Sequence, residues 1–225
     1  MPTAVETRPR RPLPPPPEWF GEWTIGEGWA RFFGRVGSAQ VAACASAQVI
    51  TAICSWNRLS VAGSGSRALA GAIVRSGESC RIDPERPHVM ILFADSRLPL
   101  GVLIEDEIIG SLHRLSYARA ARWRRVLFGL VPETPMASAV QVAPVSRRGP
   151  HPMSVMHPDA ATARTNWSRI AEVMRLTQGR MALADASRRA GFVSVTQCSQ
   201  ALVQLIGLTP AVLGLDMYGP ANRRA

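Results

Sequence analysis

The sequence predicts an α+β fold in which a small β-barrel or sandwich precedes a helical domain. From Trp29 to about Leu103, short apolar runs are punctuated by Gly, Ser and Pro, as in a chain of many short strands. From Trp167 onward, apolar residues recur at helical spacing, and glycines follow the apolar runs. With 225 residues and 47% apolar composition, the chain is long enough to build two small cores.

The chain is strongly basic, with a formal net charge of +10. Such a charge attracts polyanions and favours nucleic acid over acidic membranes or metabolites as a partner. All 26 basic residues are arginine, however, and this composition is equally typical of a GC-rich genome. Charge alone therefore does not decide whether the protein binds nucleic acid.

Four cysteines are scattered through the chain without a C-x-x-C pair, and no secretory signal precedes them. This pattern predicts neither a disulfide framework nor a zinc finger, and a reducing cytoplasm is the simplest compartment. The longest apolar candidate for a membrane span, Val41 to Cys54, is interrupted by polar residues. We therefore expect a soluble cytoplasmic protein with no membrane partner.

The first part of the chain divides into an arm and a β-rich domain. Residues 1–18 contain three arginines and the run Pro14 to Pro17, which predicts a disordered basic arm. Residues 19–103 form the predicted β domain. Its expected strands lie within five apolar runs: Arg31 to Val36, Val41 to Cys54, Leu59 to Val61, Ala68 to Val74, and His88 to Phe93.

Two connecting segments follow. Residues 104–130 have apolar side chains near helical spacing and predict an amphipathic connector, either one long helix or two short ones. Residues 131–160 are rich in Pro, Ser and His and show no period, which indicates a linker or a degenerate domain.

Residues 161–225 form the predicted helical domain. Its first helix carries an apolar stripe that includes Trp167 and Met174, and we expect Gly179 to end it through a positive φ. A second helix is expected from about Ala182 to Ala190.

A third helix is expected from Val195 to Ile206, after the turn that begins at Gly191. Ser194 is its expected N-cap, and Gln197 completes a capping box. Gly207 should end the helix, and the following Thr-Pro pair should open a short final one.

Two short helices joined by a glycine-containing turn are typical of a helix-turn-helix, in which the second helix enters the major groove. A plain helical hairpin is the alternative interpretation of the same pattern. Either interpretation predicts a small core, made by Leu183, Ala186, Ala190, Phe192, Leu202 and Ile206.

The stretch Leu183 to Phe192, followed by Gln197 to Leu202 and by Ile206-Gly-Leu-Thr-Pro210, resembles the second helix-turn-helix of the AraC/XylS family of transcription regulators. The Gly-Phe turn and the closing Gly-x-Thr-Pro are the most specific parts of that likeness. The resemblance covers about 47 residues, because the preceding helix is similar to the family's linker helix. It implies a regulator that binds double-stranded DNA.

The sequence also departs from the family. No charged residue occurs from Val195 to Ile206, where family members carry basic residues, so phosphate contacts should be weaker there. The family's first helix-turn-helix would fall at about residues 137–164, a proline-rich stretch that points to a degenerate or absent unit.

The resemblance, with the chemistry of base edges, selects the candidate DNA-contacting residues. Arg188 and Arg189 would hold the phosphate backbone, although two solvated arginines are an equal alternative. The base-reading set comprises Ser194, Val195, Thr196, Gln197 and Gln200.

The β-rich half resembles the small cupin-like sensor barrel of many such regulators, which implies a small-molecule effector or a protein partner. Related barrels often carry histidines near the positions of Cys44 and Cys80, whereas His88 is the single histidine here. A metal needs three or four converging ligands, so we predict no metal and no other cofactor, with buried, unreactive cysteines.

The sequence shows no catalytic motif, and we predict that the protein is not an enzyme. The first hypothesis is a sequence-specific transcription regulator, acting as a monomer or a homodimer. The second is a relative that no longer binds DNA and acts through protein contacts. The third, a barrel enzyme using Cys44 or Cys80 with a metal, would require bound metal after purification.

Overall fold

The structure is a computed structural model that describes residues 19–36, 39–53, 59–61, 69–84, 88–129 and 160–215. The predicted arm (residues 1–18) and nearly all of the predicted linker (residues 131–160) lie outside the described residues. The chain forms, in order, β1 (Trp19–Gly26), β2 (Trp29–Val36), β3 (Ala39–Val41), β4 (Ser46–Ala52), β5 (Leu59–Val61), β6 (Gly71–Val74), β7 (Cys80–Pro84), β8 (His88–Asp95), α1 (Pro99–Asp106), β9 (Leu112–Leu115), α2 (Tyr117–Gly129), α3 (Ala160–Gln178), α4 (Leu183–Arg189) and α5 (Val195–Ile206).

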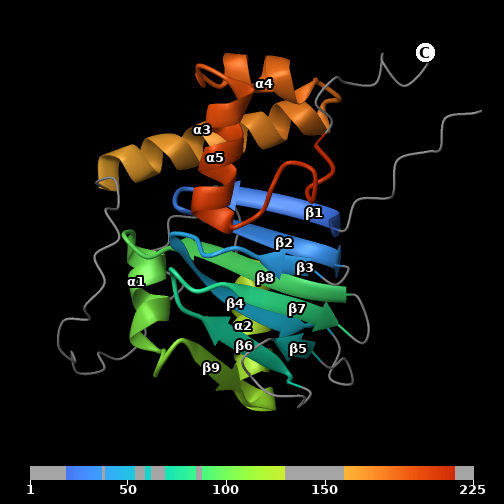
Figure 1. Ribbon diagram of the computed structural model, residues 1–225. Helices are drawn as coiled ribbons and strands as arrows, with labels where there is room; N and C mark the ends of the chain where they lie inside the picture. The colour runs from blue at the N-terminus through green and yellow to red at the C-terminus, as the bar shows by residue number, and fades with distance from the viewer. Residues whose placement is uncertain are drawn as a thin grey trace, which may run out of the picture.

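The strands form two antiparallel sheets (Figure 1). The larger has the order β1-β2-β8-β4-β6-β9, and the smaller has the order β3-β7-β5. The α+β class is confirmed, but the closed barrel is wrong, because β1 and β9 are opposite edges of an open sheet. The physical reason is burial on both faces. All seven residues of β4 and seven of eight in β8 are buried, which requires a covering layer on each side.

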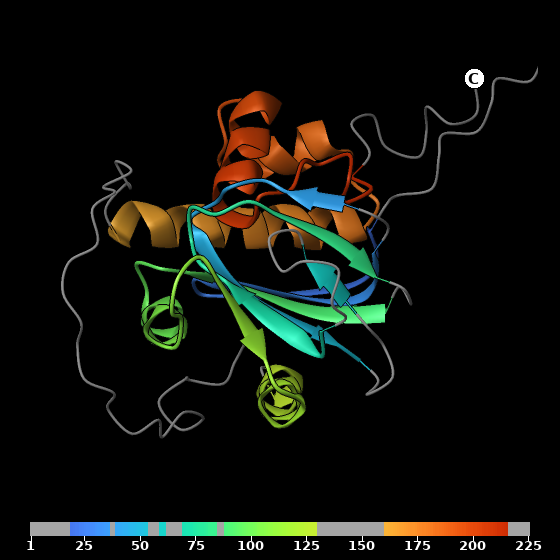
Figure 2. The same ribbon diagram turned by 60° about the horizontal axis from the view of Figure 1, so that its bottom comes forward.

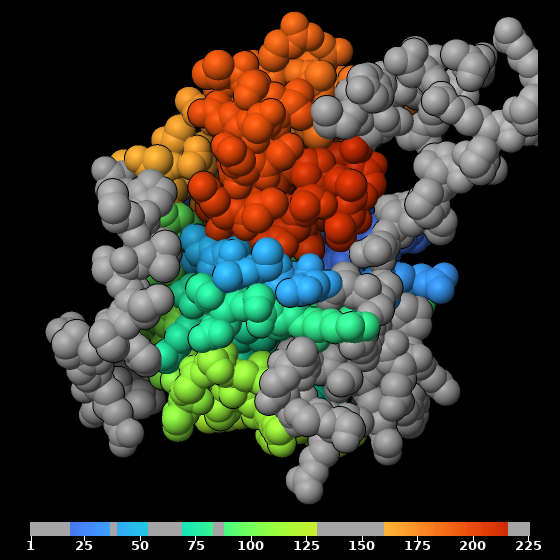
Figure 3. Space-filling model, in the orientation of Figure 1, coloured from blue at the N-terminus to red at the C-terminus, as the bar shows by residue number. Residues whose placement is uncertain are grey.

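Helices cover both faces of the larger sheet, with α3 to α5 on one side and α1 and α2 on the other (Figure 2). On one face, side chains such as Phe32 and Phe93 pack with α3, α4, α5 and the smaller sheet in one continuous core. On the other face, Met90 and Leu92 pack with α1 and α2. We refer to α3, α4 and α5 as the helical block. It shares its core with the strands, and Figure 3 shows it in direct contact with them.

The predicted helical connector at residues 104–130 is not helical throughout. Helix α1 ends at Asp106, β9 then pairs with β6, and α2 begins at Tyr117. Gly110 interrupts the helix with φ of 87°. The free edge of β6 supplies hydrogen-bond partners for Leu112 to Leu115, so tertiary pairing overrides the helical spacing.

The helical block matches the expected order of helices, with corrections at their ends. Helix α5 has the predicted bounds, and α4 is one residue shorter at each end than predicted. Arg180, and not Gly179, takes the positive φ after α3, at 67°. The amide of Met181 donates to the carbonyl of Leu176 at 3.2 Å, which makes this end a Schellman motif with arginine at the left-handed position. Residues 210–214 form hydrogen-bonded turns in place of the expected final helix.

The C-terminal end of α5 is fastened to the chain between β3 and β4. The amides of Ala42 and Ala45 donate to the carbonyls of Gly207 and Gln204 at 3.0 and 2.7 Å. The hydroxyl of Ser46 donates to the carbonyl of Leu205 at 2.6 Å. These bonds satisfy carbonyls that every helix leaves unpaired at its end. They also explain why the apolar run from Val41 to Cys54 is split between two strands.

A second connection joins α3 to the sheet. The indole Nε1 of Trp167 donates to Asp95 Oδ2 at 2.9 Å, and the same buried carboxylate is paired with Arg97. Desolvation raises the pKa of Asp95, but the hydrogen bonds from Arg97 and Trp167 outweigh it and leave the pKa below its ordinary value.

Among the described helices, none is both long enough and apolar enough to cross a lipid bilayer.

Candidate nucleic-acid interface

Helices α4 and α5 pack against α3 around a small core at the end of the chain. Five of the six predicted core residues are buried: Leu183, Ala186, Phe192, Leu202 and Ile206. The sixth, Ala190, is half-buried and packs against the same core. The burial predicted for these residues from helical spacing is therefore confirmed, but they are part of the core shared with the strands and do not form a separate small one.

The turn between α4 and α5 depends on one glycine. Gly191 has φ of 86°, a conformation that disfavours any side chain. The next residue, Phe192, donates its amide to the carbonyl of Ser187 at 3.0 Å and buries its ring. Val193 then leaves the core and is 89% exposed. The turn thus anchors one apolar side chain and presents the next to solvent.

The N-cap of α5 forms as predicted. Ser194 Oγ accepts from the amide of Gln197 at 3.1 Å. In a capping box the third residue returns a bond to the amide of the cap, but here Gln197 Oε1 accepts from Val193, one residue earlier, at 2.8 Å. Reading adenine in bidentate fashion needs both Oε1 and Nε2 of a glutamine. The bond from Val193 occupies one of the two lone pairs of Gln197 Oε1 and so limits the positions from which the side chain can read a base.

The structure brings most of the predicted base-reading residues to one exposed surface. Ser194, Thr196, Gln197 and Gln200 are exposed, whereas Val195 is half-buried and packs on the core. Gln204, which sequence reasoning did not include, is also exposed. Gln204 lies four residues after Gln200 and so on the same side of the helix, and this spacing could have identified it from the sequence. We refer to Thr196, Gln197, Gln200 and Gln204 as the polar face of α5.

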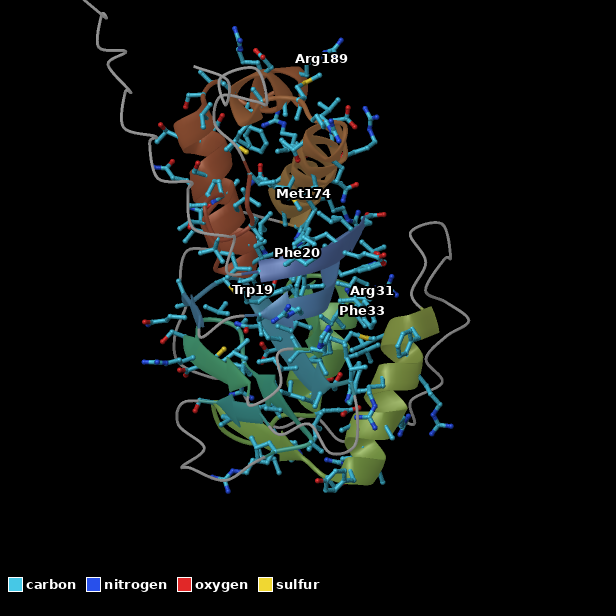
Figure 4. All side chains as sticks on the ribbon, turned by 90° about the vertical axis from the view of Figure 1, so that its right-hand side faces the viewer. Trp19, Phe20, Arg31, Phe33, Met174 and Arg189 are labelled. Atoms are coloured by element: carbon cyan, nitrogen blue, oxygen red, sulfur yellow. The ribbon has the colours of Figure 1, made fainter. Side chains whose placement is uncertain are left out.

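The two predicted phosphate-binding arginines lie at the end of α4, next to the turn. Figure 4 shows Arg189 at the outer end of the helical block, away from the strands. The Arg188 side chain is 70% exposed and pairs with Asp185. Arg189 is close enough to help lower the pKa of Glu172, after the larger effect of the hydrogen bond from Arg175. Both arginines are accessible, and each has an acidic residue nearby.

A third arginine near the turn was missed by sequence reasoning. The guanidinium carbon of Arg169, on α3, lies 5.8 Å from the ring centroid of Phe192, a cation–π arrangement. The helical spacing of apolar residues identifies the buried side of α3, and Arg169 is not one of these residues. The sequence pattern therefore did not indicate that Arg169 contacts the turn.

The cysteines of the β-rich half are buried and joined through one side chain. Cys80 Sγ donates to Gln48 Oε1 at 3.3 Å, and Gln48 Nε2 donates to Cys44 Sγ at 3.8 Å. Burial raises the pKa of Cys44 to about 11 and that of Cys80 to about 12. Within the described ranges, no three His, Cys, Asp or Glu side chains converge as a metal site would require.

No known protein family matches the sequence, and no curated protein matches it either. Solved structures of ToxT from Vibrio cholerae resemble it in fold. An apo ToxT variant from strain SCE256 has a TM-score of 0.42 and 7% identity, over 85% of this chain and 99% of that one. ToxT from strain O395, bound to (E)-4-(8-methylnaphthalen-1-yl)but-3-enoic acid, has a TM-score of 0.37 and 10% identity, over 84% and 99%. The likeness is one of general chain path.

Proposed function

We propose that the protein is a sequence-specific transcription regulator of AraC type, in which α4, the turn and α5 form a DNA-binding helix-turn-helix. The observation that carries the proposal is the polar face of α5. It is exposed and free of acidic side chains, and the exposed Arg188 and Arg189 lie at the end of α4, just before the turn that leads to it. A helix placed in this way can enter a major groove, with arginines at the phosphates beside it.

The chemistry of the polar face suggests how it reads bases. Gln200 is exposed and offers both its amide oxygen and its amide nitrogen to adenine. The methyl group of Thr196 can contact the methyl of thymine. Gln197 contributes donors from Nε2 while its oxygen remains on Val193. We therefore expect A·T-rich specificity, with Gln200 as its main source.

The β-rich half is proposed to sense an unidentified small molecule or protein partner. Support comes from its connection to the reading helix, because the chain between β3 and β4 holds the C-terminal carbonyls of α5. A ligand that favours another arrangement of this chain would change the position of α5. Whether the protein acts as a monomer or a homodimer determines if the operator has one half-site or two.

Selection of bound duplexes from a random DNA pool tests the function. We expect an enriched motif, and its half-site spacing reports the oligomeric state. Gln200→Ala should weaken binding to that motif by about 1–3 kcal/mol and relax specificity at one base pair. Gln178→Ala, at the exposed C-terminal end of α3, is the matched control and should leave the motif unchanged. Folded protein that shows no salt-sensitive binding at low ionic strength would contradict the proposal.

A second candidate is a regulator that has lost DNA binding and acts through protein contacts. The observation in its favour is that α5 has no charged side chain, while Arg188 pairs with Asp185. This candidate predicts a stable complex in a pull-down that is indifferent to Arg188→Ala and Arg189→Ala. It also predicts no enrichment from the random DNA pool.

A further inference from the structure

A cleft of about 710 Å³ lies between the turn that joins β1 to β2 and the first half of α3. Four of its lining residues come in two pairs with helical i, i+4 spacing: Arg164 with Ser168, and Thr165 with Arg169. All four side chains carry hydrogen-bond donors and share one side of α3. The Thr165 hydroxyl donates to the carbonyl of Ala161 at 3.0 Å, so the wall of donors that the cleft presents consists of Arg164, Ser168 and Arg169.

One acidic residue faces this wall. Glu27, in the turn between β1 and β2, pairs with Arg164 at 3.2 Å. Both side chains are largely exposed, at 72% for Glu27 and 58% for Arg164. An exposed pair of this kind is weak, so Arg164 can exchange its partner for another anion at little cost.

One residue of the cleft also contacts the turn between α4 and α5. Arg169 lines the cleft and also lies over Phe192. Its Nε is 3.6 Å from the position that a Cβ on Gly191 would occupy. An anion in the cleft would therefore lie beside the turn from which α5 begins.

We propose that this cleft binds a backbone phosphate of the same DNA duplex whose major groove α5 enters. The inference rests on the proposed function and adds a site to it. Arg169 is the principal ligand, because a guanidinium fork matches two phosphate oxygens. Arg164 leaves Glu27 to join it, and the hydroxyl of Ser168 donates to the phosphate. These contacts supply the phosphate binding that the uncharged α5 lacks.

A duplex suits the cleft better than a free small anion. A site for a small ligand normally encloses most of the ligand surface. Here the side chains that would close the cleft, Arg164 and Glu27, are largely exposed. A continuous phosphate backbone needs an open site along the protein surface.

The test is the salt dependence of binding to a 30-bp duplex, followed by fluorescence anisotropy. Each phosphate contact contributes about 0.9 to the slope of log Kobs against log salt concentration. Because one phosphate is bound, we expect Arg169→Ala, which removes the principal ligand, to lower that slope by up to about 0.9 and Arg164→Ala to lower it by a smaller amount. Arg125→Ala is the matched control: it removes the same charge from an exposed position on α2, across the sheet. The control should keep the wild-type slope.

Two further variants separate binding from packing. Arg169→Lys keeps the charge and should retain most of the slope that Arg169→Ala loses. Glu27→Gln removes the competitor for Arg164 and should tighten duplex binding, whereas Glu78→Gln, an exposed change outside the cleft, should not. Circular dichroism at the assay temperature checks that each variant is folded.

The outcomes distinguish the two proposals. Wild-type protein that binds no duplex at low salt contradicts the proposed function itself. Wild-type protein that binds with a steep slope, while both cleft variants keep that slope, overturns only the phosphate site. Saturable binding of inorganic phosphate that depends on Arg169, with an unchanged duplex slope, would also overturn it in favour of a small-anion site.

Discussion

Gly207, the residue that ends α5, combines two demands that only glycine meets. Its φ is 72°, and a Cβ there would overlap the carbonyl oxygen of Ala42 and come within 2.7 Å of Val41 Cγ1. The glycine therefore permits both the left-handed turn and the close approach of α5 to the chain between β3 and β4. Sequence reasoning predicted the first role from the position of Gly207 after an apolar run. The second role depends on a contact between distant segments, which no local pattern encodes.

Gly207→Ala should destabilise the protein by more than the left-handed conformation alone accounts for. Gly77→Ala is the control, because Gly77 has φ of 79° with nothing within 4 Å of the added Cβ. We expect the control to cost about 1–2 kcal/mol and Gly207→Ala to cost clearly more. Equal free energies of unfolding for the two variants, measured in urea, would show that the contact with Ala42 is unimportant.

The thiols of Cys44 and Cys80 should resist alkylation at pH 8. Their pKa values are raised to about 11 and about 12, so little reactive thiolate forms at that pH, and both side chains are buried. Peptide mapping after iodoacetamide treatment should find both cysteines unmodified in native protein. Both should be modified in guanidinium chloride. Rapid modification of the native protein would contradict this account.

Elements at the end of the chain were predicted more accurately than those in the middle. The bounds of α5 follow from signals within the segment itself, namely the Ser194 cap, the apolar stripe and Gly207. The structure of residues 104–130 was predicted less accurately because Leu112 to Leu115 pair with β6, a strand about 40 residues earlier in the chain. Their conformation therefore depends on the edge of a distant strand and not on local spacing. The sequence also did not predict the open sheet or the cleft beside α3, since both arise where distant segments meet.

Asp95→Asn tests the connection between β8 and α3. The variant removes the carboxylate charge that pairs with Arg97, whose side chain is 13% exposed. Removing one partner from a buried pair costs about 3–5 kcal/mol. Asp185→Asn breaks an exposed pair with Arg188 and should cost less than about 1 kcal/mol. Equal unfolding free energies for the two variants would contradict a stabilising role for the buried pair.

The same carboxylate makes stability depend on pH. Because the folded-state pKa of Asp95 lies below its ordinary value near 3.9, its contribution is complete above that value. The contribution is lost as the pH falls through the lower folded-state pKa. The difference in stability between the wild type and Asp95→Asn should therefore shrink below about pH 4. Urea titrations from pH 7 to pH 2.5 measure it, and a difference that stays constant would exclude this linkage.

At the scale of the whole molecule, the sheet and the helical block share one apolar core, in which Trp167 and Leu202 pack with side chains of the strands. We expect a single cooperative thermal transition, with tryptophan fluorescence and far-UV circular dichroism changing together. Two separate transitions would indicate that the halves are independent domains, as the sequence alone suggested.

Basic residues occupy both sides of the molecule. Helix α2 carries four arginines on the far side of the sheet from α4 and α5. Among the described residues, the arginines are therefore spread over both sides of the sheet and not gathered at one surface. This distribution explains why net charge predicted a polyanion partner without locating the site. The positions of the turn and the cleft, in contrast, single out Arg188, Arg189 and Arg169 as candidate phosphate ligands.

The hydrogen bonds at the C-terminal end of α5 have a mechanical consequence. The helix has 12 residues and is about 18 Å long, with its base held by Ala42, Ala45 and Ser46. Thr196 and Gln197 lie near its other end, the tip, which packs with α3 and α4 and moves furthest when the helix rotates about this base. A rotation of about 5° at the base moves that tip by about 1.6 Å, given the rise of about 1.5 Å per residue. A displacement of that size is enough to break a hydrogen bond. A slight rearrangement beside Ser46 would therefore suffice to change which groups the tip can contact.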